Sequence, residues 1–293
     1  MTIISKKLQF SVEGDVLQAV LYTPERAGNG PLPGVVVTGA WTTVKEQMPT
    51  TYAKALAQRG FAALVFDFRG WGQSAGEPRY LEDPARKTED TRHAARFLAS
   101  LPEVDEASVY GVGICASSGY MADAVATVPV LQKLALVAPW LHDPEMATQI
   151  YGGPDMAQSL IAAGREAASA AEPTYMVAAS ATDENALMYQ APYYTETDRG
   201  MIAAYDNKFN VASWEPWLSY DAQQIAEKLS KATLIVASEA AALPASAHAF
   251  VKRTHAPISE VWLDDVSQFD FYDKPAVVEQ VADELAVFFK SEG

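Results

Sequence analysis

The chain has 293 residues, of which 49% are hydrophobic and 20% are charged. These values exclude a disordered or fibrous protein, because a chain of this size and composition can bury a sizeable core. The formal net charge of -15 argues against binding to nucleic acid or to an anionic membrane surface, since both need basic patches. One large domain, or a domain with an insertion, fits the length.

The sequence predicts neither a membrane span nor a secretory signal, because it has no long apolar stretch and residues 1–7 lack an apolar core. With a single cysteine, no internal disulfide is possible. We therefore expect a cytoplasmic protein, since this chain needs no oxidising compartment. The expected partner is a small-molecule substrate, with no nucleic acid and no membrane, and a homodimer is compatible with the sequence.

The first elements predict the start of a sheet. Residues 7–22 alternate loosely around a central turn, which indicates an antiparallel hairpin at the sheet edge. The apolar runs at 34–41 and 61–70 are too short for helices and are typical of buried parallel strands. Between these runs we expect a helix at about 48–59, with Gly60 as its C-terminal stop.

The next segments continue the alternation of strand and helix. Residues 87–101 carry Ala and Leu at helical spacing and end before Pro102. Residues 109–120 then predict a strand that runs through a sharp turn into a helix. Alternation of this kind implies right-handed crossovers and a mostly parallel central sheet flanked by helices, the α/β class.

The turn inside residues 109–120 carries the main chemical signal, because Cys115 occupies the position of a nucleophile. A nucleophile elbow brings strand and helix so close that the positions two before and two after the nucleophile must be small. Gly113 and Ser117 fill these positions, which gives the motif G-x-C-x-S. The alternative is that Cys115 is a small buried core residue, as free cysteines commonly are.

After a strand at 134–138 the composition shifts toward Ala, Met and aromatic residues, up to about residue 231. We predict that 141–231 form a helical cap inserted into a core made of 1–140 and 232–293. Tyr189, Tyr193 and Trp214 are the candidates for substrate binding, although most aromatic residues of such a cap pack its own helices together. Strands at 232–237 and 260–263 and a helix at 275–289 complete the core.

The chain has four histidines, and His142 is the best placed to assist Cys115. It follows the strand next after the elbow and so should open near the same sheet edge. The alternative is a hinge histidine that is hydrogen-bonded to backbone. Four scattered histidines and one cysteine do not make a usual zinc site, and no glycine-rich phosphate loop is present. We therefore expect no metal and no cofactor.

Five short motifs together resemble the α/β-hydrolases, and in particular the bacterial dienelactone-hydrolase-like group. The motifs are Thr43-Val-Lys-Glu-Gln47, Asp67-Phe-Arg-Gly-Trp-Gly-Gln-Ser74, Gly113-Ile-Cys-Ala116, Ala138-Pro-Trp-Leu-His-Asp143 and Phe269-Asp-Phe-Tyr-Asp273. They span most of the chain in the expected order. The resemblance implies an α/β-hydrolase fold and an oxyanion hole made by the backbone N–H groups of Ala116 and Trp41.

The same resemblance exposes a degenerate triad. It places a histidine just before Phe269, where this chain has Gln268. It places the acid at about Ala241, and the loop has Glu239 as its only carboxylate, so either Glu239 substitutes or the acid is absent. Glutamine cannot accept a proton from the thiol or return one to a leaving group. The general acid–base contribution, of order 100-fold to 10,000-fold, is then lost unless another group provides it.

Three functions remain open at this point. The first is a hydrolase or acyl transferase that acts on an apolar ester, thioester or lactone through Cys115, assisted by His142 or Glu239. The second is a non-hydrolytic lyase, isomerase or cyclase in which Gln268 hydrogen-bonds the ligand. The third is a catalytically silent ligand-binding protein that keeps the fold only. A helix N-terminus behind Cys115 leads us to expect a depressed thiol pKa.

Overall fold

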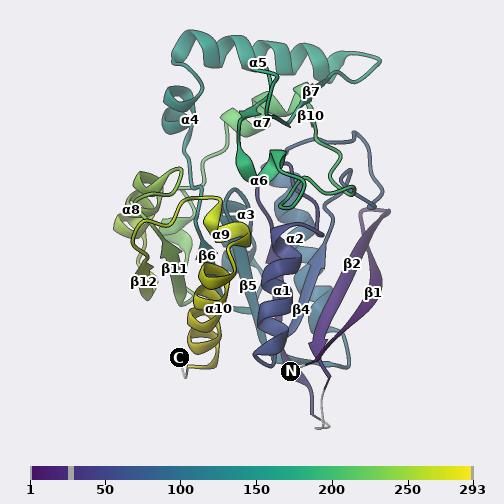
Figure 1. Cartoon of the computed structure of the whole chain (residues 1–293), viewed down its shortest axis with the longest axis vertical. Helices are drawn as coiled ribbons and strands as arrows, with labels where there is room; N and C mark the ends of the chain where they lie inside the picture. The colour runs from purple at the N-terminus through teal and green to yellow at the C-terminus, as the bar shows by residue number, and fades with distance from the viewer. Residues whose placement is uncertain (1, 26–29, 292–293) are drawn as a thin grey trace.

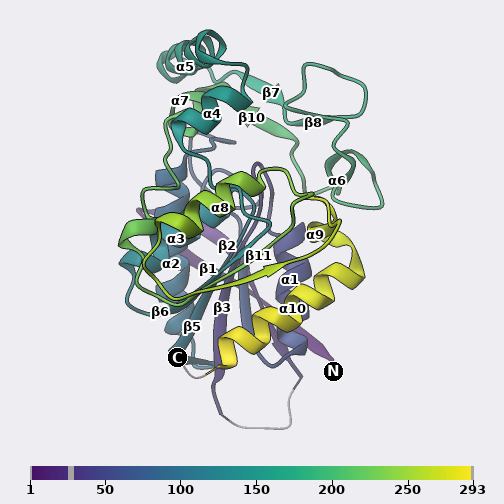
Figure 2. The same cartoon turned by 90° about the vertical axis from the view of Figure 1, so that its left-hand side faces the viewer.

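The computed structural model describes residues 2–25 and 30–291 and contains an eight-stranded sheet with helices on both faces (Figures 1 and 2). The strands of this sheet, in chain order, are β1 (Ile3–Val12), β2 (Asp15–Pro24), β3 (Leu32–Thr38), β4 (Ala62–Phe66), β5 (Val104–Ile114), β6 (Leu131–Val137), β11 (Thr233–Ala237) and β12 (Ile258–Trp262). Their spatial order is β1-β2-β4-β3-β5-β6-β11-β12. The predicted α/β class is confirmed.

The sheet is parallel from β4 to β12, and only the N-terminal hairpin departs from this direction. β1 pairs antiparallel with β2, and β2 pairs antiparallel with β4. The hairpin thus forms one edge of the sheet, as predicted. Every residue of β4 and of β11 is buried, because helices cover both faces of these strands and leave no side for polar residues.

The helices of the core divide between the two faces. They are α1 (Met48–Gln58), α2 (Pro84–Ala99), α3 (Ser117–Thr127), α8 (Pro244–Arg253), α9 (Asp270–Asp273) and α10 (Pro275–Lys290). α1 packs against α10 on one face, and α2 packs against α3 on the other (Figure 1). No helix in the described ranges is long and apolar enough to cross a membrane.

The insertion between β6 and β11 lies over the carboxyl ends of the parallel strands, at the end of the molecule opposite both termini (Figure 1). Its elements are α4 (Pro144–Ile150), α5 (Pro154–Ser169), β7 (Tyr175–Val177), β8 (Ala179–Ser180), β9 (Met188–Tyr189), α6 (Pro192–Thr195), β10 (Lys208–Asn210), α7 (Trp214–Leu218) and the 3-10 turns η1 (Val211–Ser213) and η2 (Ala226–Lys228). The insertion is helical as expected in α4 and α5, and beyond α5 the short helices α6 and α7 alternate with turns and two small two-stranded sheets.

Candidate active site

Cys115 lies at the sharp turn between β5 and α3, as the motif predicts. Its φ of +56° is a strained value for a residue with a side chain, and such strain is typical of functional sites. A Cβ added at Gly113 would stand 2.7 Å from the carbonyl oxygen of Ser117, so only glycine fits there. The Ser117 hydroxyl closes the turn by donating to the carbonyl oxygen of Ile114 at 3.1 Å. The residues on either side of Cys115 therefore fix it at the turn, just beyond the C-terminal end of β5.

A pocket of about 350 Å³ opens above Cys115 between the sheet and the insertion. This volume lies at the lower end of the range of small-molecule sites. Core and insertion both contribute walls, which are mostly apolar and aromatic. The lining residues are Trp41, Cys115, Ala116, Trp140, Ile150, Tyr151, Leu187, Met188, Tyr194, Trp217, Ala242, Gln268, Phe269 and Tyr272. The insertion thus covers the nucleophile position, as predicted for the cap.

Two backbone donors converge on the sulfur of Cys115. They are the N–H groups of Ala116 and Trp41, the pair that the resemblance implies for an oxyanion hole. The loop that carries Trp41 is held by its neighbour, Thr42, which has a φ of +61°. The Thr42 N–H donates to the carboxylate of Glu82 at 3.0 Å. Through this hydrogen bond, Glu82 fixes the backbone path of the loop that carries Trp41.

Glu82 belongs to a buried ion pair that sequence reasoning missed. Its carboxylate lies 2.7 Å from the ammonium of Lys87 and also accepts from the Tyr120 hydroxyl at 2.9 Å. The ammonium lies over the ring of Trp71 at 4.5 Å, which adds a cation–π contact. Burial lowers the pKa of Lys87, and Glu82 opposes this effect. Glu82 precedes α2 and Lys87 lies in its first turn, and only the fold reveals that both charged side chains are buried.

Replacing Lys87 by methionine is expected to lower the free energy of unfolding by about 3–5 kcal/mol, since it leaves the carboxylate of Glu82 buried without its cation. Urea unfolding followed by circular dichroism measures the loss. The matched control is Lys7→Met on the exposed face of β1, which should change stability by no more than about 0.5 kcal/mol. Equal stability of the two variants would show that the pair contributes nothing.

The expected depressed pKa of Cys115 is wrong. Burial raises the pKa of the Cys115 thiol above its ordinary value, while hydrogen bonds from Tyr272, Ala116 and Trp41 act in the opposite direction. Cys115 is only 7% exposed, and the loss of hydration outweighs the helix N-terminus on which the expectation rested. The thiol form of Cys115 therefore predominates at neutral pH.

The rate of Cys115 alkylation by iodoacetamide is therefore expected to rise with pH through a midpoint above that of N-acetylcysteine measured in the same buffers. The raised pKa gives the sign, because only the thiolate reacts. Cys115 is the only cysteine, so the loss of free thiol reports on this side chain alone. A midpoint below that of N-acetylcysteine would contradict the account of burial.

Gln268 lines the pocket and is 7% exposed. Its side-chain N–H groups donate to the carbonyl oxygen of Ala138 at 2.9 Å and to the hydroxyl of Tyr272 at 3.0 Å. Its side-chain oxygen accepts from the N–H of Ala242 at 3.1 Å. Gln268 is thus tied into the protein, and it reaches Cys115 through Tyr272.

His142 does not assist Cys115, which corrects the sequence prediction. The indole N–H of Trp140 donates to Nδ1 of His142 at 3.0 Å, and Nε2 lies 2.9 Å from the carbonyl oxygen of Trp217. These partners fix one neutral tautomer, and burial lowers the pKa of the imidazole. Both ring nitrogens are used, so His142 is the hinge histidine of the alternative interpretation.

Glu239 is also misassigned as the acid. Its side chain is 71% exposed and lies 2.7 Å from Nε2 of His248, on the outer surface. Ala241 and Ala242 occupy the part of the loop that faces Gln268, and neither carries a carboxylate. This loop therefore has no carboxylate at the position where the family places the acid of the triad.

The three residues predicted to bind substrate stand outside the pocket lining. Tyr189 is 40% exposed and binds Gln190. Tyr193 stacks edge-on against Tyr272, and Trp214 packs behind Trp41, so both support the wall without facing the cavity. Sequence spacing could not separate these layers. Tyr272 was missed although it lies in the motif that set the register of Gln268.

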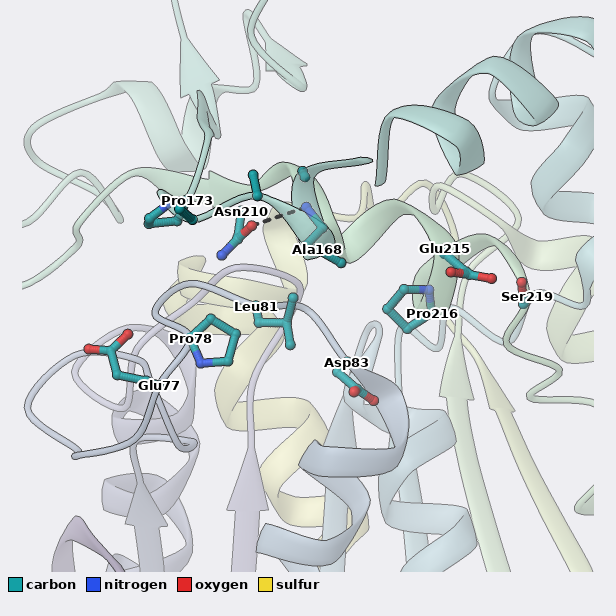
Figure 3. Close-up of a pocket in the computed structure, with 14 residues that line it drawn as sticks. Glu77, Pro78, Leu81, Asp83, Ala168, Pro173, Asn210, Glu215, Pro216 and Ser219 are labelled. Carbon is teal, nitrogen blue, oxygen red and sulfur yellow. Dashed lines mark hydrogen bonds between the residues drawn. The ribbon is translucent and has the colours of Figure 1, made fainter. Parts of the chain in front are cut away.

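A larger and more open groove of about 820 Å³ lies elsewhere, between α5 and the loop before α2 (Figure 3). Glu77, Asp83 and Glu215 stand at its edges, and Leu81 and Pro216 form part of its apolar surface. It contains no cysteine, histidine or lysine among its lining residues. The pocket over Cys115 is therefore the better candidate for chemistry.

Comparison with known proteins places the chain in a family and a fold. The family described as X-Pro dipeptidyl-peptidase (S15 family) matches residues 13–237. Protein YcjY of Escherichia coli is 28% identical over 94% of each chain. Protein PA2218 of Pseudomonas aeruginosa is 41% identical over 39% of this chain, a match that spans only 30% of its own length. A fungal thiohydrolase, aneE of Aspergillus aculeatus, is 32% identical over 36% of this chain and 32% of its own.

Two solved structures show the fold. The crystal structure of PA2218 covers 98% of this chain and 93% of its own with a TM-score of 0.83 and 24% identity. The dienelactone hydrolase of Anabaena variabilis covers 98% of this chain and 97% of its own with a TM-score of 0.60 and 13% identity. The predicted α/β-hydrolase fold is thereby confirmed, and the dienelactone hydrolase shares it.

Proposed function

The chain belongs to the family described as X-Pro dipeptidyl-peptidase (S15 family), and we propose that it takes the acyl group of an apolar ester, thioester or lactone onto Cys115. The observation that carries the proposal is the convergence of the Ala116 and Trp41 N–H groups on the Cys115 sulfur at the pocket floor. Preorganised donors of this kind stabilise the oxyanion of a tetrahedral intermediate.

The reaction has two steps. In the first, the thiol of Cys115 gives its proton to water, Sγ of the thiolate bonds to the acyl carbon, and the bond to the leaving group breaks so that this group departs as an anion. In the second, water or another nucleophile attacks the thioester and restores the free thiol. The pocket walls favour an apolar acyl chain, since they include Ile150, Leu187 and Met188.

The missing base limits which leaving groups can depart. Gln268 cannot protonate a leaving group, so groups that depart as stable anions are favoured, such as thiolates and aryl oxides. An amine from a peptide bond needs protonation, and this argues against peptide cleavage in spite of the family description. The likeness to the thiohydrolase aneE supports a thioester among the accepted substrates.

The second candidate, a non-hydrolytic enzyme in which Gln268 binds the ligand, loses its main support. Both N–H groups of Gln268 are already donated to Ala138 and Tyr272. The amide is therefore not a free donor in the pocket. The missing base is also compatible with slow release of the acyl group from Cys115. It therefore does not require a non-hydrolytic reaction.

Stopped-flow measurement of p-nitrophenol release from p-nitrophenyl butyrate tests the proposal. We expect a burst that approaches one equivalent per protein, followed by slow turnover, since acylation has a good leaving group and deacylation has no base. Linear release without a burst, at a rate no greater than in buffer, would contradict it and would favour a silent ligand-binding protein.

A further inference from the structure

The orientation of the Gln268 amide is settled by two backbone groups. The Ala242 N–H can only donate, and it lies 3.1 Å from Oε1. The Ala138 carbonyl oxygen can only accept, and it lies 2.9 Å from Nε2. Exchanging the amide oxygen and nitrogen would break both contacts. Nε2 therefore faces Tyr272 with its second N–H.

This orientation decides where the proton of the Tyr272 hydroxyl points. Nε2 of Gln268 lies 3.0 Å from that hydroxyl, and an amide nitrogen cannot accept, so the tyrosine oxygen is the acceptor. The hydroxyl proton is then free to serve another partner. This hydroxyl also forms a hydrogen bond with the sulfur of Cys115, which lines the same pocket. The Tyr272 O–H thus donates to Sγ.

Packing holds Tyr272 in this position. The side chain is 1% exposed, and the rings of Tyr193 and Phe269 stand edge-on against it at 5.1 and 5.9 Å. Burial raises the pKa of Tyr272 well above its ordinary value, so the hydroxyl keeps its proton. A fixed, protonated hydroxyl is a donor that needs no reorganisation when charge forms on sulfur.

We propose that hydrogen bonds directed from Ala242 through Gln268 and Tyr272 to Cys115 replace the usual acid–base pair with a fixed donor for charge on the sulfur. In this arrangement Tyr272 touches the reacting atom, and Gln268 is a positioning residue that acts through it. The inference rests on the function proposed above and deepens it. When a substrate oxygen occupies the N–H groups of Ala116 and Trp41, Tyr272 is the donor that stays with the sulfur.

A glutamate at position 268 gives the sharpest test, because it keeps the shape and reverses the direction. A carboxylate accepts hydrogen bonds and cannot donate them. In Gln268→Glu the Tyr272 hydroxyl would therefore donate to the new carboxylate and no longer to the sulfur. Gln268→Glu and Tyr272→Phe should therefore weaken the thiolate in the same way. Tyr193→Phe is the matched control, since this neighbouring tyrosine makes its hydrogen bond to the backbone of Met48.

The experiment is the iodoacetamide alkylation rate against pH for the parent and the three variants, after circular dichroism has shown that each is folded. We expect Tyr272→Phe and Gln268→Glu to react about tenfold more slowly at pH 8, the effect of one lost hydrogen bond to a charged group, with midpoints shifted upward. Tyr193→Phe should match the parent. A parent-like profile for Tyr272→Phe would overturn the donor role, and one for Gln268→Glu alone would overturn the directing role of Gln268.

This readout is independent of substrate, so the two proposals can fail separately. A Cys115-dependent burst combined with parent-like alkylation of Tyr272→Phe would remove the hydrogen-bonded chain and leave the proposed function. A shifted alkylation profile without any burst would support the hydrogen-bonded chain and remove the proposed function.

Discussion

Replacing Cys115 by alanine is expected to abolish the burst of p-nitrophenol and to reduce turnover by on the order of a thousandfold or more, since the acyl acceptor is removed. Cys115→Ser should be equally inactive, because a serine hydroxyl needs a general base and Gln268 is none. Steady-state and stopped-flow release from p-nitrophenyl butyrate measure both effects.

The control for this pair is Ser118→Ala. Ser118 is the nearby hydroxyl on α3, and it donates to the carbonyl oxygen of Gly113 without lining the pocket. This variant should keep the burst. Substantial turnover in Cys115→Ala would place the reaction elsewhere. A fast Cys115→Ser variant would mean that a base is present after all.

Gln268→His is expected to raise hydrolytic turnover by about 100-fold, the lower end of what general acid–base catalysis contributes. The expected gain in turnover is at the lower end of that range because Ala241 and Ala242 offer no carboxylate to orient the new imidazole. Adding Ala241→Asp should raise turnover further. A pH limb near the ordinary pKa of histidine should appear in the rate of deacylation.

Gln268→Leu serves as its control, since it removes the amide and adds no base. Turnover should not rise in this variant. The measurement is the steady-state rate after the burst, where deacylation is limiting. An unchanged rate in both Gln268→His and the double variant would show that position 268 does not face the acyl group.

Much of the fold could be predicted because it depends on local patterns. The short apolar run at 61–70 is typical of a buried strand, and the structure places β4 at its start. The hairpin, the helix before Gly60 and the final helix follow from equally local signals. The insertion was harder, because its aromatic residues pack on distant partners and its short strands β7 to β10 carry little periodicity.

In the site, too, the features that depend on local sequence could be predicted, and those that depend on tertiary contacts could not. Backbone geometry at Cys115 is a local property, and G-x-C-x-S predicts it. The role of His142 depends on Trp217, which is 75 residues away, and the thiol pKa depends on burial under the insertion. Tyr272 needed the direction of the Gln268 amide, which only three-dimensional contacts reveal. Groups whose protonation depends on tertiary partners lie beyond sequence patterns.

Intact-mass spectrometry of the protein after brief mixing with a butyryl thioester tests the central claim most directly. The account predicts an added mass equal to one butyryl group on most of the protein, mapped by peptide analysis to Cys115, and no addition to Cys115→Ala. An unmodified parent protein, or an acyl group found on another residue and retained in Cys115→Ala, would contradict it.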